Sequence, residues 1–124
     1  QVVFTFKAPE HPIYVDINPA LHSWTIENLV KNAIDAMKGK GSLNIIISEL
    51  EDIVKISITD SGKGIPKNQF TKVFEPGFTT KKRGWGLGLS LTKRIVQEYH
   101  KGKIKVAHSE IGKGTTMQIS YKTA

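Results

Sequence analysis

The feature that most constrains the fold is one amphipathic segment, because a helix with a single apolar stripe must pack on another element. Within residues 19–37, apolar side chains recur at offsets of 0, 3, 4, 7, 8 and 11, in the order Ile26, Leu29, Val30, Ala33, Ile34 and Met37. This spacing lines one face of an α-helix. Gly39 and Gly41 then end the pattern. The sequence therefore predicts a helix over residues 19–37 that packs on a second layer.

β-rich runs before and after this helix can supply that layer. Two of them are joined by a short polar turn and predict a hairpin, and two more close the chain around a glycine-containing turn. Another pair, separated by a turn with two prolines, predicts a hairpin-like start. The predicted strands are Val2–Lys7, 13–16, 43–48, 53–59, 103–108 and 115–121.

The middle of the chain contains a long stretch without periodicity. A short helix is expected after Pro66, but residues 73–86 show neither helical nor strand spacing, which is typical of a lid or binding loop. A second helix follows, with Leu87, Leu91, Ile95 and Tyr99 recurring every four residues, and it stops near Gly102. The order predicts one α+β domain over residues 1–124. It is a two-layer α/β sandwich with about three helices on one face of a mixed, mostly antiparallel sheet.

Composition excludes several classes of protein. The chain has no cysteine, so disulfide frameworks, cysteine-based zinc sites and cysteine nucleophiles are ruled out. Its longest apolar run is far shorter than the roughly 20 residues that span a bilayer. A net charge of +7 favours an anionic partner, and basic residues concentrate between Lys67 and Arg83, in the expected loop.

Three polar residues on the first helix form one candidate site. Asn28, Asn32 and Asp35 project within about 60° of one another on an ideal helix, opposite the apolar stripe. Taken alone, such a cluster is more simply explained as a solvated helix face. An amide oxygen is also a hard ligand that suits Mg²⁺, which usually keeps waters and substrate phosphates.

A second candidate follows the predicted strand 53–59. In Asp60-Ser61-Gly62-Lys63-Gly64-Ile65, the carboxylate can accept from an exocyclic amine, while the glycines let a flat ligand approach the backbone. An ordinary Asp-Ser-Gly turn is the other interpretation.

The third candidate is Gly84-Trp85-Gly86-Leu87-Gly88-Leu89, a glycine-rich turn that runs into a helix. Amides at such a helix start suit phosphate. The spacing fits neither the Rossmann fingerprint nor a Walker motif. Thr79-Thr80-Lys81-Lys82-Arg83 precedes it, either as cations for a triphosphate or as a solvated basic loop.

Taken in order, these motifs resemble the catalytic, ATP-binding domain of sensor histidine kinases, within the GHKL superfamily of gyrase-type ATPases and the ninety-kilodalton chaperone. The resemblance covers nearly the whole chain. Five segments match its N, G1, F and G2 boxes and its closing glycine-threonine turn, namely Glu27-Asn28-Leu29-Val30-Lys31-Asn32-Ala33, Asp60-Ser61-Gly62-Lys63-Gly64, Phe74-Glu75-Pro76-Gly77-Phe78, Gly84-Trp85-Gly86-Leu87-Gly88-Leu89 and Gly112-Lys113-Gly114-Thr115.

The resemblance implies a role for each candidate residue. Asp60 would accept from adenine N6, and Asn32 would bind Mg²⁺ through its side-chain oxygen. Asn28 would lie near the phosphates, where gyrase-type relatives carry a glutamate that activates water. An amide there favours phosphoryl transfer over hydrolysis. The remaining implied ATP contacts are Gly62, Gly64, Ile65, Lys81, Arg83, Gly84, Gly86, Leu87, Gly88 and Thr115.

The chain departs from the family pattern at two places, one on the first helix and one at the end of the second. Asp35 and Ala36 replace a Lys and Tyr common in histidine kinases, so Lys31 or a lid cation would have to take over the phosphate contact. Glu98-Tyr99-His100-Lys101-Gly102 replaces a commoner His-Gly-Gly, which affects only a turn.

The resemblance also implies partners. None of the four histidines lies in the acceptor context of a histidine kinase. We therefore expect an excised catalytic fragment, not competent alone, that serves a two-component system. Its partners would be an acceptor-histidine dimerisation domain and, through that histidine, a response regulator. We expect the fragment to be cytoplasmic, in a parent protein that can be a membrane-anchored receptor, with no membrane contact of its own.

Two rival functions stay open at this point. An anti-sigma-type serine-protein kinase shares the fold and the boxes, and an acceptor-histidine helix pair upstream would distinguish it. A basic nucleic-acid-binding module fits the charge, but few aromatic residues are interleaved with lysines and arginines, so we expect no nucleic-acid partner.

Overall fold

The computed structural model describes residues 1–76 and 88–124. One strand precedes the first helix, and a pair of strands follows each of the two helices, with short helical turns between β3 and α2. In order they are β1 (Val2–Lys7), α1 (Pro19–Ala36), β2 (Gly41–Leu50), β3 (Ile53–Asp60), two 3₁₀ turns (Lys67–Gln69 and Lys72–Phe74), α2 (Gly88–Arg94), a π-helical turn (Ile95–Tyr99), β4 (Lys103–Glu110) and β5 (Gly114–Lys122).

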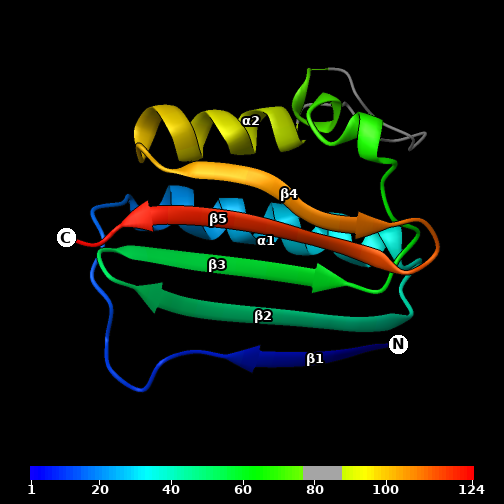
Figure 1. The fold of residues 1–124 in the computed structure, drawn as a ribbon, viewed down its shortest axis with the longest axis horizontal. Coiled ribbons are helices and arrows are strands. Elements are labelled where there is room, and N and C mark those ends of the chain that lie inside the picture. The colour runs from blue at the N-terminus through cyan, green and yellow to red at the C-terminus, as the bar shows by residue number, and fades with distance from the viewer. Residues whose placement is uncertain (77–87) are drawn as a thin grey trace.

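The strands form one five-stranded sheet in the order β1-β2-β3-β5-β4, as Figure 1 shows. β1 pairs with β2 in parallel, and every other pairing is antiparallel. This confirms the mixed, mostly antiparallel sheet. In the register, Asp60 at the end of β3 lies opposite Thr115 near the start of β5. The two residues that the sequence placed in separate motifs are therefore neighbours.

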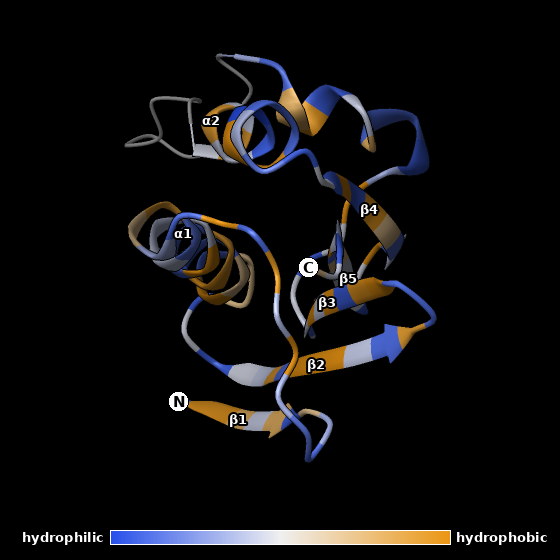
Figure 2. Ribbon diagram, turned by 90° about the vertical axis from the view of Figure 1, so that its left-hand side faces the viewer, coloured by the Kyte–Doolittle hydropathy of each residue, from blue (hydrophilic) through white to orange (hydrophobic). Residues whose placement is uncertain are grey.

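The helices lie on one side of the sheet and enclose the core against it (Figure 2). Along β3, alternate side chains are buried while those between them are partly exposed, as expected when only one face is covered. On α1, the buried apolar residues Leu29 and Ala33 come from the predicted stripe and belong to the same core cluster as Leu43 and Ile58. The predicted two-layer α+β sandwich is confirmed.

Both ends of α1 follow from local chemistry. Asn18 is the N-cap, and its side-chain oxygen accepts a hydrogen bond from the Leu21 amide at 3.0 Å. Pro19 occupies the first helical position, where a missing amide hydrogen costs nothing. The helix ends at Ala36, one residue before the predicted limit, and Met37 caps it.

The predicted N-terminal hairpin is wrong. Residues 13–16 form no strand, and β1 pairs with β2 instead. The alternation in 13–16 has a different cause, because Ile13, Val15 and Ile17 pack against the core from an extended segment over residues 8–18, which we call the strap. Alternation indicates an extended chain but does not identify its partner. A parallel β1–β2 pair needs a crossover, and α1 supplies it.

The expected loop over 73–86 is described only in part. Val73 and Phe74 lie in the second 3₁₀ turn and are buried, so the first residues of this stretch are helical, and residues 77–86 lie outside the described part. The first 3₁₀ turn, Lys67–Gln69, confirms the short helix after Pro66. In the described residues, no helix is long and apolar enough to cross a membrane.

Candidate functional site

Asp60 is a buried carboxylate at the end of β3. Its residue is 8% exposed, and one carboxylate oxygen accepts a hydrogen bond from the Gly62 amide at 2.8 Å. Burial raises the pKa of Asp60, while hydrogen bonds from the backbone amides of Gly62 and Thr115 oppose that shift. Keeping a carboxylate out of water costs free energy, so its position favours a functional role over a simple turn.

Hydroxyl groups from β4 and β5 lie next to this carboxylate. The Ser109 hydroxyl lies 2.7 Å from the Thr115 hydroxyl and accepts from the Ile65 amide at 2.7 Å. It also donates to the Gly114 carbonyl at 3.0 Å. Ser109 therefore ties the loop after β3 to the start of β5. Sequence reasoning missed this residue, whose only signal was a serine beside the turn between two predicted strands.

The glycines after Asp60 are explained by close backbone packing. A Cβ on Gly62 would lie 2.7 Å from the carbonyl group of Ala36, the last residue of α1. Gly64 has a φ of +82°, and a Cβ there would overlap the Glu110 carbonyl. The loop therefore runs in close contact with both the end of α1 and the β4–β5 turn. This packing requires glycine at both positions, whether or not a flat ligand also approaches.

Asn28 joins α1 to α2. Its side-chain amide donates to the Thr92 hydroxyl at 2.9 Å, and that hydroxyl donates to the Gly88 carbonyl at 2.7 Å. Thr92 is fully buried, and a Cβ on Gly88 would lie 3.0 Å from the Asn28 side chain. Sequence reasoning missed Thr92, although a threonine one turn after the glycine-rich motif was a usable signal.

The alternative interpretation of Asn28, Asn32 and Asp35 as a solvated helix face needs correction. Asn28 and Asn32 are half-buried, and only Asp35 is exposed. The reason is that α2 packs beside α1 and covers part of the face that the helical wheel left free. Asn32 lies one turn after Asn28, between the α2 contact and the loop after β3.

The described site residues gather at one end of the molecule. In Figure 1, the end of β3, the start of β5, the end of α1 and the described start of α2 all lie on the right. Asn28 and Ala36 are eight residues apart, so about 12 Å of helix separates the α2 contact from the Asp60 loop. Asn32 lies between these two groups. Five predicted contacts, Lys81, Arg83, Gly84, Gly86 and Leu87, lie outside the described residues.

The Asn32 side chain fits a metal ion whose other ligands are mostly waters and substrate phosphates. Among the described residues, no group of three histidine, aspartate or glutamate side chains could hold a metal ion. Mg²⁺ needs no such cage, because it typically binds one or two protein oxygens together with waters and substrate phosphates. The Asn32 side-chain oxygen is of the required chemical type.

Known proteins are similar to this chain in sequence and in fold. The family model described as histidine kinase-, DNA gyrase B- and HSP90-like ATPase matches residues 20–124. The sensor histidine kinase ZraS of Escherichia coli K12 is 40% identical over 119 residues, which is 96% of this chain and 25% of that protein. The chain thus spans about a quarter of the length of this relative.

Solved structures give the same result. The catalytic domain of histidine kinase ThkA has a TM-score of 0.86 and is 30% identical, with 98% of this chain and 78% of that chain covered. A structure of ThkA in complex with the response regulator protein TrrA has a TM-score of 0.84 at 28% identity, covering 99% of this chain and 34% of that one.

Proposed function

Because the chain belongs to the family of histidine kinase-, DNA gyrase B- and HSP90-like ATPases, we propose that it binds Mg²⁺-ATP and transfers the γ-phosphoryl group to a histidine of a dimerisation domain. The observation that carries this proposal is Asp60. A carboxylate that is buried at a cost, at the edge where β3, β5 and the end of α1 meet, can accept a further donor besides the Gly62 and Thr115 amides.

The adenine amine is the donor that we assign to Asp60. The exocyclic N6 group of adenine donates, whereas guanine presents an acceptor oxygen at the corresponding position. The Thr115 and Ser109 hydroxyls, linked to each other at 2.7 Å, can complete the polar wall beside the base. Gly62, Gly64 and Ile65 carry the backbone that would lie along the ring.

Asn32 and Asn28 are assigned to the triphosphate end. Asn32 would hold Mg²⁺ through its side-chain oxygen, and the ion supplies charge neutralisation to the phosphates when it is bound. Asn28, already fixed by Thr92, would be positioned beside them. We assign Lys81, Arg83, Gly84, Gly86, Leu87 and Gly88 to the same end, as cations and amides. Phosphoryl transfer depends mainly on such positioning and neutralisation.

Asn28 explains why phosphoryl transfer is favoured over the hydrolysis of ATP. An amide has no useful basicity near neutral pH, so Asn28 does not activate water as a glutamate would. The γ-phosphoryl group therefore stays available until an acceptor arrives. The acceptor histidine and, through it, a response regulator are the proposed partners. The names of ZraS, a sensor kinase, and of the ThkA–TrrA complex support this assignment over a serine-protein kinase.

Radiolabelled ATP tests the proposal. With Mg²⁺ and labelled ATP, the chain alone should stay unlabelled, and the acceptor domain of the whole protein, added in trans, should gain an acid-labile phosphate. Asn32→Ala should abolish that label, and Asn68→Ala, an exposed asparagine on the first 3₁₀ turn, should not. Acid-labile phosphate on the chain alone, or an acid-stable phosphoserine on the acceptor, contradicts the proposal.

A further inference from the structure

The side of the sheet that faces away from the helices is basic. Figure 1 looks onto this side, with α1 behind the sheet, and no helix of the described residues covers it. Successive strand residues point to opposite sides of a sheet, so lysines that alternate with buried core residues lie on the uncovered side. The register adds one lysine from β1. We call this set the lysine face, and it consists of Lys7, Lys55, Lys103, Lys105 and Lys122.

Four of these lysines surround one residue, Ser120 in β5. Ser120 pairs with Lys55 of β3 on one side and with Lys103 of β4 on the other. Neighbouring strands lie about 4.8 Å apart, so the backbones at Lys55 and Lys103 are about 10 Å apart. Lys105 and Lys122 each lie two residues along a strand from this row, or about 7 Å. The positive charge is therefore concentrated at one place on the sheet.

No carboxylate of the described residues pairs with these lysines. None of the five forms an ion pair within the part of the chain that the structure describes. Among the strand residues, the one carboxylate on this side is Glu110, at the far end of β4, and it is paired with Lys113 at 2.9 Å. Like charges held this close repel one another, and a polyanion would relieve that repulsion.

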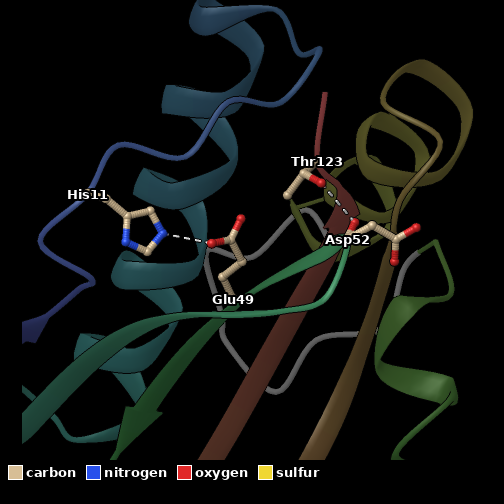
Figure 3. A network of polar contacts seen from close by, with 4 residues as sticks. All are labelled: His11, Glu49, Asp52 and Thr123. Atoms are coloured by element: carbon tan, nitrogen blue, oxygen red, sulfur yellow. Dashed lines mark hydrogen bonds and ion pairs between the residues drawn. The ribbon is translucent and has the colours of Figure 1, made fainter.

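Two further carboxylates border the lysine face at the β2–β3 hairpin. Glu49 is turned towards the strap, where its carboxylate lies 2.7 Å from the His11 ring (Figure 3). Asp52 lies in the turn itself, and its backbone carbonyl accepts a hydrogen bond from the Thr123 hydroxyl at 3.2 Å. The charge of the lysine face is therefore left for a partner.

Apolar side chains lie between the lysines on the same side of the sheet. Ile46 is 44% exposed and pairs with Lys7, and Ile53 is 38% exposed and pairs with Lys122. Leu50, next to Ile53 in the register, is also exposed. An apolar strip bordered by charged side chains is typical of a surface that binds another protein, whose interface has an apolar centre and a polar rim.

Two other anionic partners fit this surface less well. Among the strand residues, no phenylalanine, tyrosine or tryptophan lies on this side, so nucleic-acid bases would have no ring to stack on. The strands also carry no arginine, the residue that binds phosphate with two parallel hydrogen bonds. A membrane surface would meet the lysine ammonium groups first, because the isoleucine side chains between them are shorter.

We propose that the lysine face binds an acidic segment of a protein partner, with carboxylates at alternate positions of an extended chain. Alternate residues of such a segment are about 7 Å apart, which is the spacing of Lys103 and Lys105 along β4. This function goes beyond the proposed kinase activity and uses a different surface. Lys55 precedes Asp60 by five residues on β3, or about 17 Å.

Amide NMR titration with a short peptide of alternating glutamate and threonine tests this inference. The peptide should give saturable shifts in β3, β4 and β5. The double variant Lys103→Glu with Lys105→Glu should weaken binding about tenfold or more, because two attractive contacts become repulsive. Lys67→Glu with Lys72→Glu is the matched control, since these exposed lysines lie on the 3₁₀ turns and change the net charge equally. It should change the affinity less than twofold.

Three results would overturn the proposal: no saturable shift on the three strands, an equal loss of affinity in the control variant, or tighter binding of an oligothymidylate or of phosphatidylserine vesicles than of the peptide. Lys55→Gln with Lys122→Gln gives an independent test should the first double variant fail to fold. It must also weaken the peptide, and wild-type affinity in this variant refutes the site. Mg²⁺-ATP affinity should be unchanged in both lysine-face variants, so failure here is distinguishable from failure of the kinase function.

Discussion

At the scale of single residues, the site rests on buried polar groups that hydrogen bonds within the fold hold in place. Asp60 is the clearest case, because its carboxylate is held at the sheet edge by backbone donors and is otherwise desolvated. The sequence predicted this residue from its place after an apolar strand. It did not predict Ser109 or Thr92, because a lone serine or threonine carries no pattern until the fold shows what its hydroxyl contacts.

Replacing Asp60 should raise the free energy of unfolding at pH 7, although it impairs nucleotide recognition. A raised pKa in the folded state means that the folded protein binds more protons than the unfolded one between pH 3.8 and the shifted value. The ionised carboxylate therefore lowers the free energy of unfolding as pH rises through that window. Asp60→Asn removes the charge and keeps one side-chain oxygen, whose two lone pairs can accept from the amides of Gly62 and Thr115. It should match the wild type near pH 4 and be more stable at pH 7.

Urea unfolding at both pH values measures this difference. Asp52→Asn, at an exposed aspartate in the β2–β3 turn, serves as the control and should show no comparable gain. A loss of stability at pH 7 in Asp60→Asn would show that the carboxylate is a structural partner, contrary to the role assigned here.

Asn32 should act on the metal and not on the base. Asn32→Ala is expected to weaken Mg²⁺-ATP binding about tenfold or more, in line with the loss of one charge-assisted contact, while adenosine binds as before. Calorimetric titrations of both ligands, with and without Mg²⁺, measure the effect. An equal loss for adenosine would make Asn32 part of the helix packing and not a metal ligand.

At the scale of elements, the contact between α1 and α2 orients the candidate phosphate end. The helices could be predicted from their apolar spacing, but their packing could not, because a helical wheel does not show which neighbour covers a polar face. The bond from Asn28 to the Thr92 hydroxyl, and from there to the Gly88 carbonyl, is the polar link between them.

Thr92→Val tests that link with little change in volume. It leaves the Asn28 amide unpaired, which should lower the free energy of unfolding by about 1–3 kcal/mol. It should also weaken Mg²⁺-ATP binding, since Asn28 is then free to turn. Thr71→Val, at an exposed threonine without a side-chain cap bond, is the control for both measurements. Unchanged stability and affinity in Thr92→Val would show that the two helices are oriented by apolar packing alone.

At the scale of the whole molecule, the topology determines which of the sequence motifs lie side by side. The parallel β1–β2 pair around α1 was missed because residues 13–17 of the strap alternate like a strand in sequence. They pack on the core without joining the sheet. The remaining topology could be predicted from hairpins and helix periodicity. It brings the ends of β3 and α1 to the start of β5, and the start of α2 to Asn28 in the middle of α1. Residues that are distant in sequence thereby form one candidate nucleotide site.

Isothermal titration of the chain with Mg²⁺-ATP and Mg²⁺-GTP tests the central claim most directly. Because Asp60 would pair with the adenine amine and face an acceptor in guanine, ATP should bind at least about tenfold more tightly than GTP. Asp60→Asn should lose most of that preference, and Asp52→Asn should retain it. Equal affinities for the two nucleotides, or an unchanged preference in Asp60→Asn, would contradict the adenine assignment.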